Sequence, residues 1–464
     1  MAIETINPAN GELIERFEET TDAEVDRALD RAQAAFEVWR ERPMAERAER
    51  MRAAAAHLET HVEEHARIIT LEMGKTIGEA RAEVRKCAWN CRHYAAEAER
   101  YVGDEPAPSN AAESYVAFRP LGVVLAIMPW NFPYWQMFRF AAPALMAGNG
   151  AILKHASNVP RSALAIERVF RESGFPEGLL RTLLIGGSRA EPLVDDPRIA
   201  AVTLTGSEEV GRRIGRRAGG ALKKAVLELG GSDPFVVLGD ADVDEAARVA
   251  VRARFQNAGQ SCIAAKRFIV EKSVIGPFLE RFAAAARALV VGDPALDATQ
   301  MGPMARHDLR GELDGQVRRS IAAGAKLACG GAPIPGPGAF FAPTILTAVR
   351  PGMAAFDEET FGPVAAVVEA NDAEDALALA NRSRFGLGSN LWTRDLDRAK
   401  RLAARVEAGS VFINGMVASD PRLPFGGVKA SGYGRELAAF GIREFTNIQT
   451  VWIGPAKGEA PRSE

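Results

Sequence analysis

The sequence predicts an α/β protein made of two successive, mostly parallel open sheets. Short apolar segments alternate with helical segments from about residue 121 to residue 239, and a second alternating series runs from about 234 to 414. Such alternation is typical of parallel sheets, because each parallel strand needs a long crossover connection that is usually a helix. With 464 residues, the chain is long enough for two or three domains with large cores.

The region before these two series is predicted to be rich in helices after a short strand-like opening. Apolar residues recur at helical spacing in residues 22–39, and Thr20 or Thr21 precedes them as a candidate N-cap. A second amphipathic stretch runs from about residue 45 to residue 71. The apolar stripe of the first helix consists of Val25, Ala28, Leu29, Ala32, Phe36 and Trp39.

The strand candidates are short apolar segments bounded by turn-forming residues. A proline-containing break at 106–110 is followed by a candidate strand at 114–119, and a last candidate lies at 446–453. The first alternating series places strands at 123–127, 150–154, 180–185, 200–204 and 225–229, with a helix at 161–173. The second series places strands at 235–238, 267–270, 364–368 and 410–413.

Composition argues against several classes of protein. A formal net charge of -3 without a basic block disfavours nucleic-acid binding, and the longest apolar run, residues 121–130, is too short to span a bilayer. Four cysteines are too few for a disulfide framework, and Cys87 and Cys91 share a helical face on which packing is expected. The opening residues lack the basic and apolar regions of a signal peptide. We therefore expect a cytoplasmic protein.

One pattern resembles a zinc-protease motif. His61-Val62-Glu63-Glu64-His65 fits H-x-x-E-H, but the segment is a highly charged helix, so a solvent-facing helix is the favoured interpretation. We predict no metal site. No G-x-G-x-x-G segment follows a predicted strand, which argues against an ordinary dinucleotide-binding sheet.

The candidate nucleophile is Cys262. It closes the segment Gly259-Gln260-Ser261-Cys262, where the backbone can approach a substrate closely and amide N–H groups can stabilise a thiolate. Glu228, which is followed by Leu229-Gly230-Gly231, is the candidate base. On these residues alone, an inert core cysteine and a surface carboxylate remain the alternatives.

Four further segments add to these two. They are Pro129-Trp130-Asn131-Phe132-Pro133, Thr205-Gly206-Ser207-Glu208-Glu209-Val210-Gly211, Glu359-Thr360-Phe361-Gly362-Pro363 and Pro424-Phe425-Gly426-Gly427-Val428-Lys429-Ala430-Ser431-Gly432. In type and order the six segments resemble the signatures of the aldehyde dehydrogenase superfamily, and the resemblance covers nearly the whole chain. That family binds its dinucleotide without the glycine fingerprint that is missing here.

The resemblance implies three structural parts. Residues 1–108 and 129–229 are expected to form a Rossmann-like cofactor domain, and residues 230–435 a catalytic domain. Residues 109–128 and 436–464 are expected to form a small β oligomerisation arm, in which the tail strand pairs with the strand near 114–119. The implied assembly is a homodimer or a homotetramer.

The implied reaction is oxidation of an aldehyde to a carboxylic acid with a nicotinamide cofactor. Cys262 forms a thiohemiacetal, and the Asn131 amide with the Cys262 backbone N–H stabilises the oxyanion. Hydride transfer leaves a thioester, which water activated by Glu228 cleaves. The presence of Glu228 favours release of the free acid over transfer to coenzyme A. Glu436 is placed near a proton path.

The cofactor assignment depends most on Ser157. NAD-preferring relatives often carry glutamate at this position, where a carboxylate grips the ribose diol and repels a 2′-phosphate. Serine removes that repulsion, so NADP⁺ is the predicted cofactor, with NAD⁺ as the alternative. The implied cofactor-binding residues are Trp130, Lys154, Ser157, Gly206, Ser207, Glu359 and Phe361.

Residues 118–124 and 131–139 resemble the corresponding segments of succinate-semialdehyde dehydrogenases, whose substrate carries a carboxylate opposite its aldehyde. The implied substrate-binding residues are Trp135, Arg139, Ser419 and Phe425, with a structural role for Arg139 as an equal alternative. The alternatives for function are the same chemistry on glutarate semialdehyde or an aliphatic aldehyde, a coenzyme A-dependent reaction, or a catalytically silent structural or binding relative.

Overall fold

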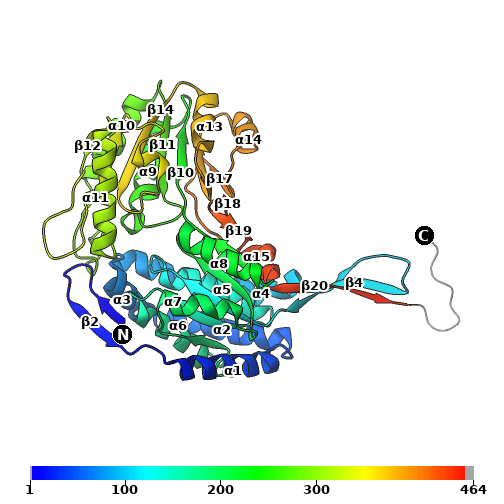
Figure 1. Cartoon of the computed structure of the whole chain (residues 1–464). Helices are drawn as coiled ribbons and strands as arrows, with labels where there is room; N and C mark the ends of the chain where they lie inside the picture. The colour runs from blue at the N-terminus through cyan, green and yellow to red at the C-terminus, as the bar shows by residue number, and fades with distance from the viewer. Residues whose placement is uncertain (1–2, 455–464) are drawn as a thin grey trace.

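The computed structural model describes residues 3–454 and contains two α/β units and a projecting β arm (Figure 1). Each unit has a mostly parallel sheet, so the predicted fold class is confirmed. The segment predicted for the arm, 436–464, runs beyond the described residues at 455–464. Among the described helices, none combines the length and apolar character needed to cross a bilayer.

The N-terminal region is a hairpin followed by four helices. Helix α1 begins at its predicted cap, because Thr21 Oγ1 accepts a hydrogen bond from the Glu24 N–H at 3.3 Å and a Glu24 carboxylate oxygen accepts one from the Thr21 N–H at 2.8 Å. All six residues of its predicted apolar stripe are buried. The amphipathic stretch at 45–71 divides into two helices at His61. The elements are β1 (Ile3–Ile6), β2 (Leu13–Phe17), α1 (Asp22–Trp39), α2 (Met44–Thr60), α3 (Val62–Met73) and α4 (Ile77–Val102).

The first sheet has six strands in the order β19-β9-β8-β5-β6-β7. The five strands β5 to β9 are parallel to one another. The edge strand β19 pairs antiparallel with β9, so that Gly432 lies opposite Glu228. All five predicted strands of the first series are present. The strands are β5 (Val123–Met128), β6 (Gly150–His155), β7 (Leu180–Thr182), β8 (Ile199–Thr205), β9 (Lys224–Glu228) and β19 (Gly432–Tyr433). The connecting helices are α5 (Pro133–Met146), α6 (Pro160–Glu172), α7 (Gly187–Ala190), η1 (Glu191–Asp195) and α8 (Glu208–Gly220).

The second sheet has seven strands in the order β12-β13-β14-β11-β10-β16-β17, and only its edge strand β12 is antiparallel. The four strands predicted for the second series all belong to it. The strands are β10 (Asp233–Val237), β11 (Ala265–Glu271), β12 (Lys326–Cys329), β13 (Thr344–Thr347), β14 (Val364–Ala370), β16 (Gly388–Trp392) and β17 (Ser410–Ile413). The helices are α9 (Val243–Phe255), η2 (Gln256–Gly259), α10 (Ile275–Arg287), α11 (His307–Ala322), α12 (Ala354–Asp357), α13 (Ala373–Asn381) and α14 (Leu396–Ala403).

The last part of the chain returns to the first unit and then leaves it as the arm. The strands β15 (Phe385–Gly386) and β18 (Val428–Lys429) form a small ladder, and α15 (Ala438–Glu444) precedes the tail strand. The tail strand β20 (Thr446–Ile453) pairs antiparallel with β4 (Glu113–Pro120), and β3 (Glu105–Pro106) completes the sheet. This is the pairing expected from the resemblance. Figure 1 shows that the arm projects away from both units.

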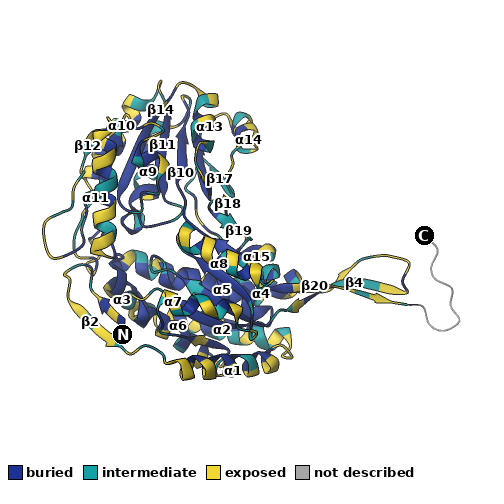
Figure 2. Cartoon of the chain, in the orientation of Figure 1, coloured by how far each residue is buried: buried dark blue, intermediate teal, exposed yellow. Residues whose placement is uncertain are grey.

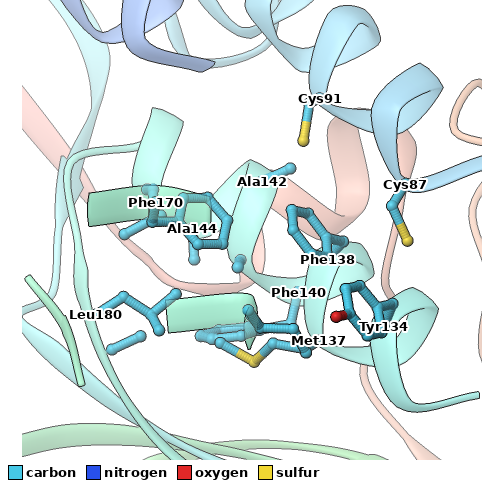
Figure 3. Packing of buried hydrophobic residues seen from close by; sticks show 14 of the residues in the cluster. Cys87, Cys91, Tyr134, Met137, Phe138, Phe140, Ala142, Ala144, Phe170 and Leu180 are labelled. Carbon is cyan, nitrogen blue, oxygen red and sulfur yellow. The ribbon is translucent and has the colours of Figure 1, made fainter. Parts of the chain in front are cut away.

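Helix α5 lies at the centre of the largest core. All of its residues are buried, which suits a helix that is apolar on nearly every side. Phe138 of α5 stacks on Phe170 of α6 with ring centroids 5.1 Å apart, and Cys87 and Cys91 of α4 face the same core, as expected of packing residues (Figure 3). Buried residues are concentrated around α5 and along the strands of both sheets (Figure 2).

The prediction of a solvent-facing helix at residues 61–65 is wrong for His65. Its side chain is fully buried, and its Nδ1 lies 2.9 Å from the Tyr134 hydroxyl. Burial lowers the pKa of His65 to about 4, so this imidazole is neutral near pH 7. Helix α3 therefore buries the neutral imidazole of His65 in the core, where the Tyr134 hydroxyl is its hydrogen-bond partner.

Candidate active site

A cavity of about 490 Å³ lies between α4, α5, the segment before β11 and the loop after β17. Cys262 lines it, together with all four of the residues predicted to contact substrate. These residues come from separate parts of the chain, so the fold brings them together as expected. They are Trp135, Arg139, Ser419 and Phe425.

The Cys262 segment is held in an unusual backbone conformation. Asn257 and Ala258 have φ angles of 53° and 51°, in a region that residues other than glycine rarely adopt. Such strain persists only where neighbouring contacts enforce it. Glu79 and Asn131 provide them, because the Asn257 N–H donates to the Glu79 carboxylate at 2.9 Å and the Asn257 side-chain amide donates to the Asn131 carbonyl at 2.9 Å.

Asn131 lies directly against this segment. Its side-chain Nδ2 donates to the Gln260 carbonyl at 3.1 Å, and its Oδ1 accepts from Gln136 Nε2 at 3.0 Å. The amide orientation is therefore fixed from both sides, and a primary amide has a second N–H to donate. Within residues 3–454, the Cys262 backbone N–H has no hydrogen-bond acceptor. Both expected donors are thus available for an oxyanion.

Glu228 ends β9 and is almost completely buried. Neither carboxylate oxygen has a hydrogen-bond partner among the described residues. Burial, opposed in part by Arg139 and reinforced by Glu436, raises the pKa of Glu228 to about 8. Three residues on, Gly231 packs so tightly on the Cys262 carbonyl that no side chain fits there. Glu228, which is protonated at neutral pH, therefore lies at the start of the turn whose Gly231 contacts the Cys262 backbone.

The Cys262 thiol is protonated in this conformation. It is partly accessible from the cavity, but the surrounding protein raises its pKa to about 12, because burial disfavours the thiolate. Arg139 and Lys266 oppose the shift without cancelling it. The expectation that backbone amides stabilise a thiolate is therefore not met in this conformation.

The residues predicted for the cofactor gather at the carboxyl edge of the first sheet. Trp130 follows β5, Lys154 lies near the end of β6, and Gly206 follows β8, and these three strands are neighbours. Open α/β sheets bind ligands outside the carboxyl ends of their strands. The arrangement can therefore hold an extended ligand along this edge.

Two further positions at this edge suit phosphate groups. Ser207 caps α8 by accepting from the Val210 N–H at 3.5 Å, so the first-turn N–H groups of α8 face the edge. Ser157 is exposed just beyond β6 and brings no negative charge. The donors present therefore fit a dinucleotide that carries an additional phosphate.

Glu359 and Phe361 approach the same region from the second unit. Glu359 accepts a hydrogen bond from the Gly231 N–H at 3.0 Å, and Lys266 Nζ lies 3.4 Å from its carboxylate. Phe361 meets the Trp130 ring edge-on with centroids 5.8 Å apart. These predicted cofactor residues therefore lie where the two units meet, next to the turn after Glu228.

Arg139 has a role that the sequence left undecided. Its buried guanidinium forms an ion pair with Glu436 and donates to Thr205 Oγ1 at 3.3 Å, and it lies 4.6 Å from the centre of the Phe425 ring. Arg139 still lines the cavity, but its charge is already balanced. This pairing favours the structural alternative for Arg139.

Sequence reasoning missed three basic residues. Arg254 donates to the Gly259 carbonyl at the end of the strained turn at 3.4 Å. Lys266 donates to the carbonyls of Ser261 and Cys262 at 2.9 Å each, and Lys86 lines the cavity from α4. The sequence did contain a signal for Lys266, because Lys266 and Arg267 interrupt an otherwise apolar strand segment. Lysine is rarely buried without a partner, so such a pair indicates a specific role. Lys86 gave no such signal, since it is one of many charged residues on a long helix.

Comparisons with known proteins agree with this geometry. The family described as Aldehyde dehydrogenase family matches residues 1–451. The chain is 54% identical, over 98% of its length and all of the relative's, to a probable succinate-semialdehyde dehydrogenase [NADP(+)] from Synechocystis sp.. It is 53% identical, over 98% of both chains, to a succinate-semialdehyde dehydrogenase [NADP(+)] from Mycobacterium avium.

Solved structures are similar throughout their length. The succinic semialdehyde dehydrogenase of Streptococcus pyogenes in complex with NADP⁺ superposes with a TM-score of 0.95 at 36% identity, covering 98% of this chain and 100% of that one. The protein Gox0499 superposes with a TM-score of 0.96 at 41% identity, with the same coverage.

Proposed function

The chain belongs to the aldehyde dehydrogenase family, and we propose that it oxidises succinate semialdehyde to succinate with NADP⁺ as its preferred cofactor. The names of the relatives at 54% and 53% identity agree with the predicted substrate and cofactor. The structural observation that carries the proposal is the contact between the Glu228 turn and the Cys262 segment, beside the fixed amide of Asn131.

Cys262 is the proposed nucleophile. Its sulfur adds to the aldehyde carbon, the carbonyl π bond breaks to give the oxyanion, and the thiol proton passes to solvent water as the carbon–sulfur bond forms. The free N–H of the Asn131 amide and the Cys262 backbone N–H donate to the oxygen that becomes negative. One such donor typically lowers a barrier by about 2.7–4 kcal/mol.

NADP⁺, when bound, supplies the hydride acceptor that turns the thiohemiacetal on Cys262 into a thioester. The proposed binding residues are Lys154 for the adenosine ribose, Ser207 for the pyrophosphate and Glu359 for the nicotinamide ribose. An exposed serine at position 157 leaves room for a 2′-phosphate without charge repulsion. These assignments are supported by the hydrogen-bond donors that gather at the carboxyl edge of the first sheet.

Glu228 is the proposed base for the hydrolytic half of the reaction. In its ionised form the carboxylate accepts a proton from water, which attacks the thioester and releases succinate. A pKa near the working pH makes both proton uptake and proton release accessible, and burial raises the pKa of Glu228 to about 8. The ion pair of Arg139 and Glu436 lies near Glu228, where Arg139 lowers the pKa of Glu228 and Glu436 raises it.

The direct test removes the sulfur. Cys262→Ala is expected to lower NADPH formation from succinate semialdehyde by about 10⁴-fold or more, because no other group can carry the acyl chain. NADPH absorbance measures the rate, and mass spectrometry of the quenched wild-type enzyme is expected to find a succinyl group on the peptide that contains Cys262. Cys329→Ala, which changes a cysteine on β12 far along the chain, is the matched control and keeps the wild-type rate. Undiminished turnover in Cys262→Ala would contradict the proposal.

We also propose that the arm joins copies of this chain in a homodimer or homotetramer in the cytoplasm. Ile448, Trp452 and Ile453 of β20 are exposed, and β20 forms one edge of the arm sheet. An apolar strand edge of this kind is suited to pairing with another chain. The free state of all four cysteines is consistent with a reducing compartment. We propose a cofactor domain at residues 1–108 and 129–229 and a catalytic domain at 230–435. The strand β5, which was predicted as part of the arm, instead pairs with β6 and β8 inside the first sheet.

A further inference from the structure

We propose that Lys86, assisted by Ser419, binds the distal carboxylate of the substrate and makes the enzyme selective for ω-carboxy aldehydes. The inference rests on the proposed function, because it concerns how the same cavity recognises succinate semialdehyde. Lys86 lies on α4, far in sequence from each of the segments that resemble family signatures.

Three elements meet around the Lys86 ammonium group. Its Nζ donates to Ser419 Oγ at 2.8 Å and lies 4.2 Å from the centre of the Trp135 ring, and all three residues line the cavity that contains Cys262. Since the Ser419 hydroxyl accepts from Lys86, its own proton remains to be donated. An ammonium and a hydroxyl therefore point to the same space and both can donate to a carboxylate.

Unlike Lys75, Arg139 and Arg248, Lys86 has no anionic partner among the described residues of the cavity. No carboxylate among residues 3–454 lies within 4 Å of its ammonium group, whereas three other lining cations are paired. The fourth, Arg252, is exposed at the rim. The paired cations are Lys75 with Glu83, Arg139 with Glu436, and Arg248 with Glu245.

The environment of Lys86 favours an incoming anion. Burial is the main cause that lowers the pKa of Lys86 to about 8, and the Arg139 charge adds to it. Only part of this is offset by the ionisable groups that face it, which are Glu83, Cys87 and Asp420. A substrate carboxylate would supply the missing charge, so binding stabilises both ions in a partly desolvated place.

The experiment compares two four-carbon aldehydes, succinate semialdehyde and the uncharged butanal. Lys86→Met is expected to lower kcat/KM for succinate semialdehyde about 10- to 100-fold, mainly through KM, because one charged hydrogen bond is lost. For butanal, kcat/KM is expected to stay the same or rise. Lys86→Arg keeps the charge and is expected to retain most of the preference. Lys326→Met, on the edge strand β12, is the matched control and leaves both values unchanged.

The outcomes separate two failures. A wild-type enzyme that oxidises both aldehydes equally well would overturn the proposed substrate and this subsite with it. A wild-type preference for succinate semialdehyde that survives in Lys86→Met would overturn the subsite alone. Equal losses for both aldehydes in Lys86→Met would also overturn it, since they indicate a structural role.

A measurement on the wild-type enzyme covers the case in which Lys86→Met does not fold. Lys86 loses its positive charge as the pH rises through its pKa of about 8. The KM for succinate semialdehyde is therefore expected to rise between pH 7 and pH 9 relative to the KM for butanal, about 10-fold at most. The ratio removes the effects of Glu228 and Cys262, which act on both aldehydes. A ratio that does not change with pH would overturn the inference.

Discussion

The carboxyl edge of the first sheet and the cavity around Cys262 are built by different means. The edge uses the end of a strand at Gly206, the start of a helix at Ser207 and the exposed side chain of Ser157. The cavity and the adjoining Glu228 turn use buried ionisable groups from distant segments, because burial raises the pKa of Glu228 to about 8 and that of Cys262 to about 12. The sheet edge therefore suits binding through its shape and its backbone N–H donors. The region around Cys262 suits chemistry through side chains whose pKa values are shifted by burial.

Glu228→Gln should give the largest effect on the cavity side of this comparison. The acyl enzyme forms but is not hydrolysed, so the steady rate is expected to fall about 10²- to 10⁴-fold while a burst of about one NADPH per site remains. Stopped-flow absorbance measures the burst and the later rate. Equal loss of both phases would assign Glu228 to the first half of the reaction instead.

The same carboxyl group predicts the pH profile. Below its pKa of about 8, Glu228 is protonated and cannot accept a proton, so hydrolysis of the acyl enzyme should rise with pH up to about 8 and then level. The rise is expected to be absent in Glu228→Gln.

Asn131→Ala is expected to have the next largest effect. Loss of one oxyanion donor should lower kcat about 10²- to 10³-fold with little change in the KM for NADP⁺. Asn131→Asp is the matched variant of nearly equal shape, and it should be no better because a carboxylate repels the oxyanion. A KM effect without a kcat effect would move Asn131 from the chemistry to the binding of ligands.

Ser157→Glu tests the edge and should give the smallest effect. A carboxylate at this position is expected to lower the NADP⁺/NAD⁺ ratio of kcat/KM about 10- to 100-fold, because it repels the 2′-phosphate. With saturating NAD⁺, kcat should stay close to that of the parent enzyme. An unchanged ratio would refute the assignment of Ser157, and a collapse of kcat would show that the two regions are less separate than the structure indicates.

Local sequence predicted the family, the fold class and the strands that the two alternating series named, and these are confirmed, whereas β12, β13 and β16 of the second sheet were not predicted. The reason is that strand and helix patterns are local, and Cys262, Glu228 and Asn131 each lie in a short recognisable segment. Their proposed roles stay predictions that the variants above can test.

What local sequence could not supply is how charges pair across the fold. The partners Arg139 and Glu436 are far apart in the chain, and nothing near either residue indicates the other. The same holds for Lys86 and Ser419. His65 failed for a related reason, because only the position of Tyr134 shows that this face of the helix is buried.

Helix α5 connects these observations. Gln136 orients the Asn131 amide on one side, Arg139 reaches Glu436, and Tyr134 and Phe138 belong to the large core on the other side. The same helix thus lines the cavity with Trp135, Gln136 and Arg139 and packs other side chains into the largest core. We therefore expect that heat or denaturant which loosens the core around α5 abolishes activity in the same unfolding transition.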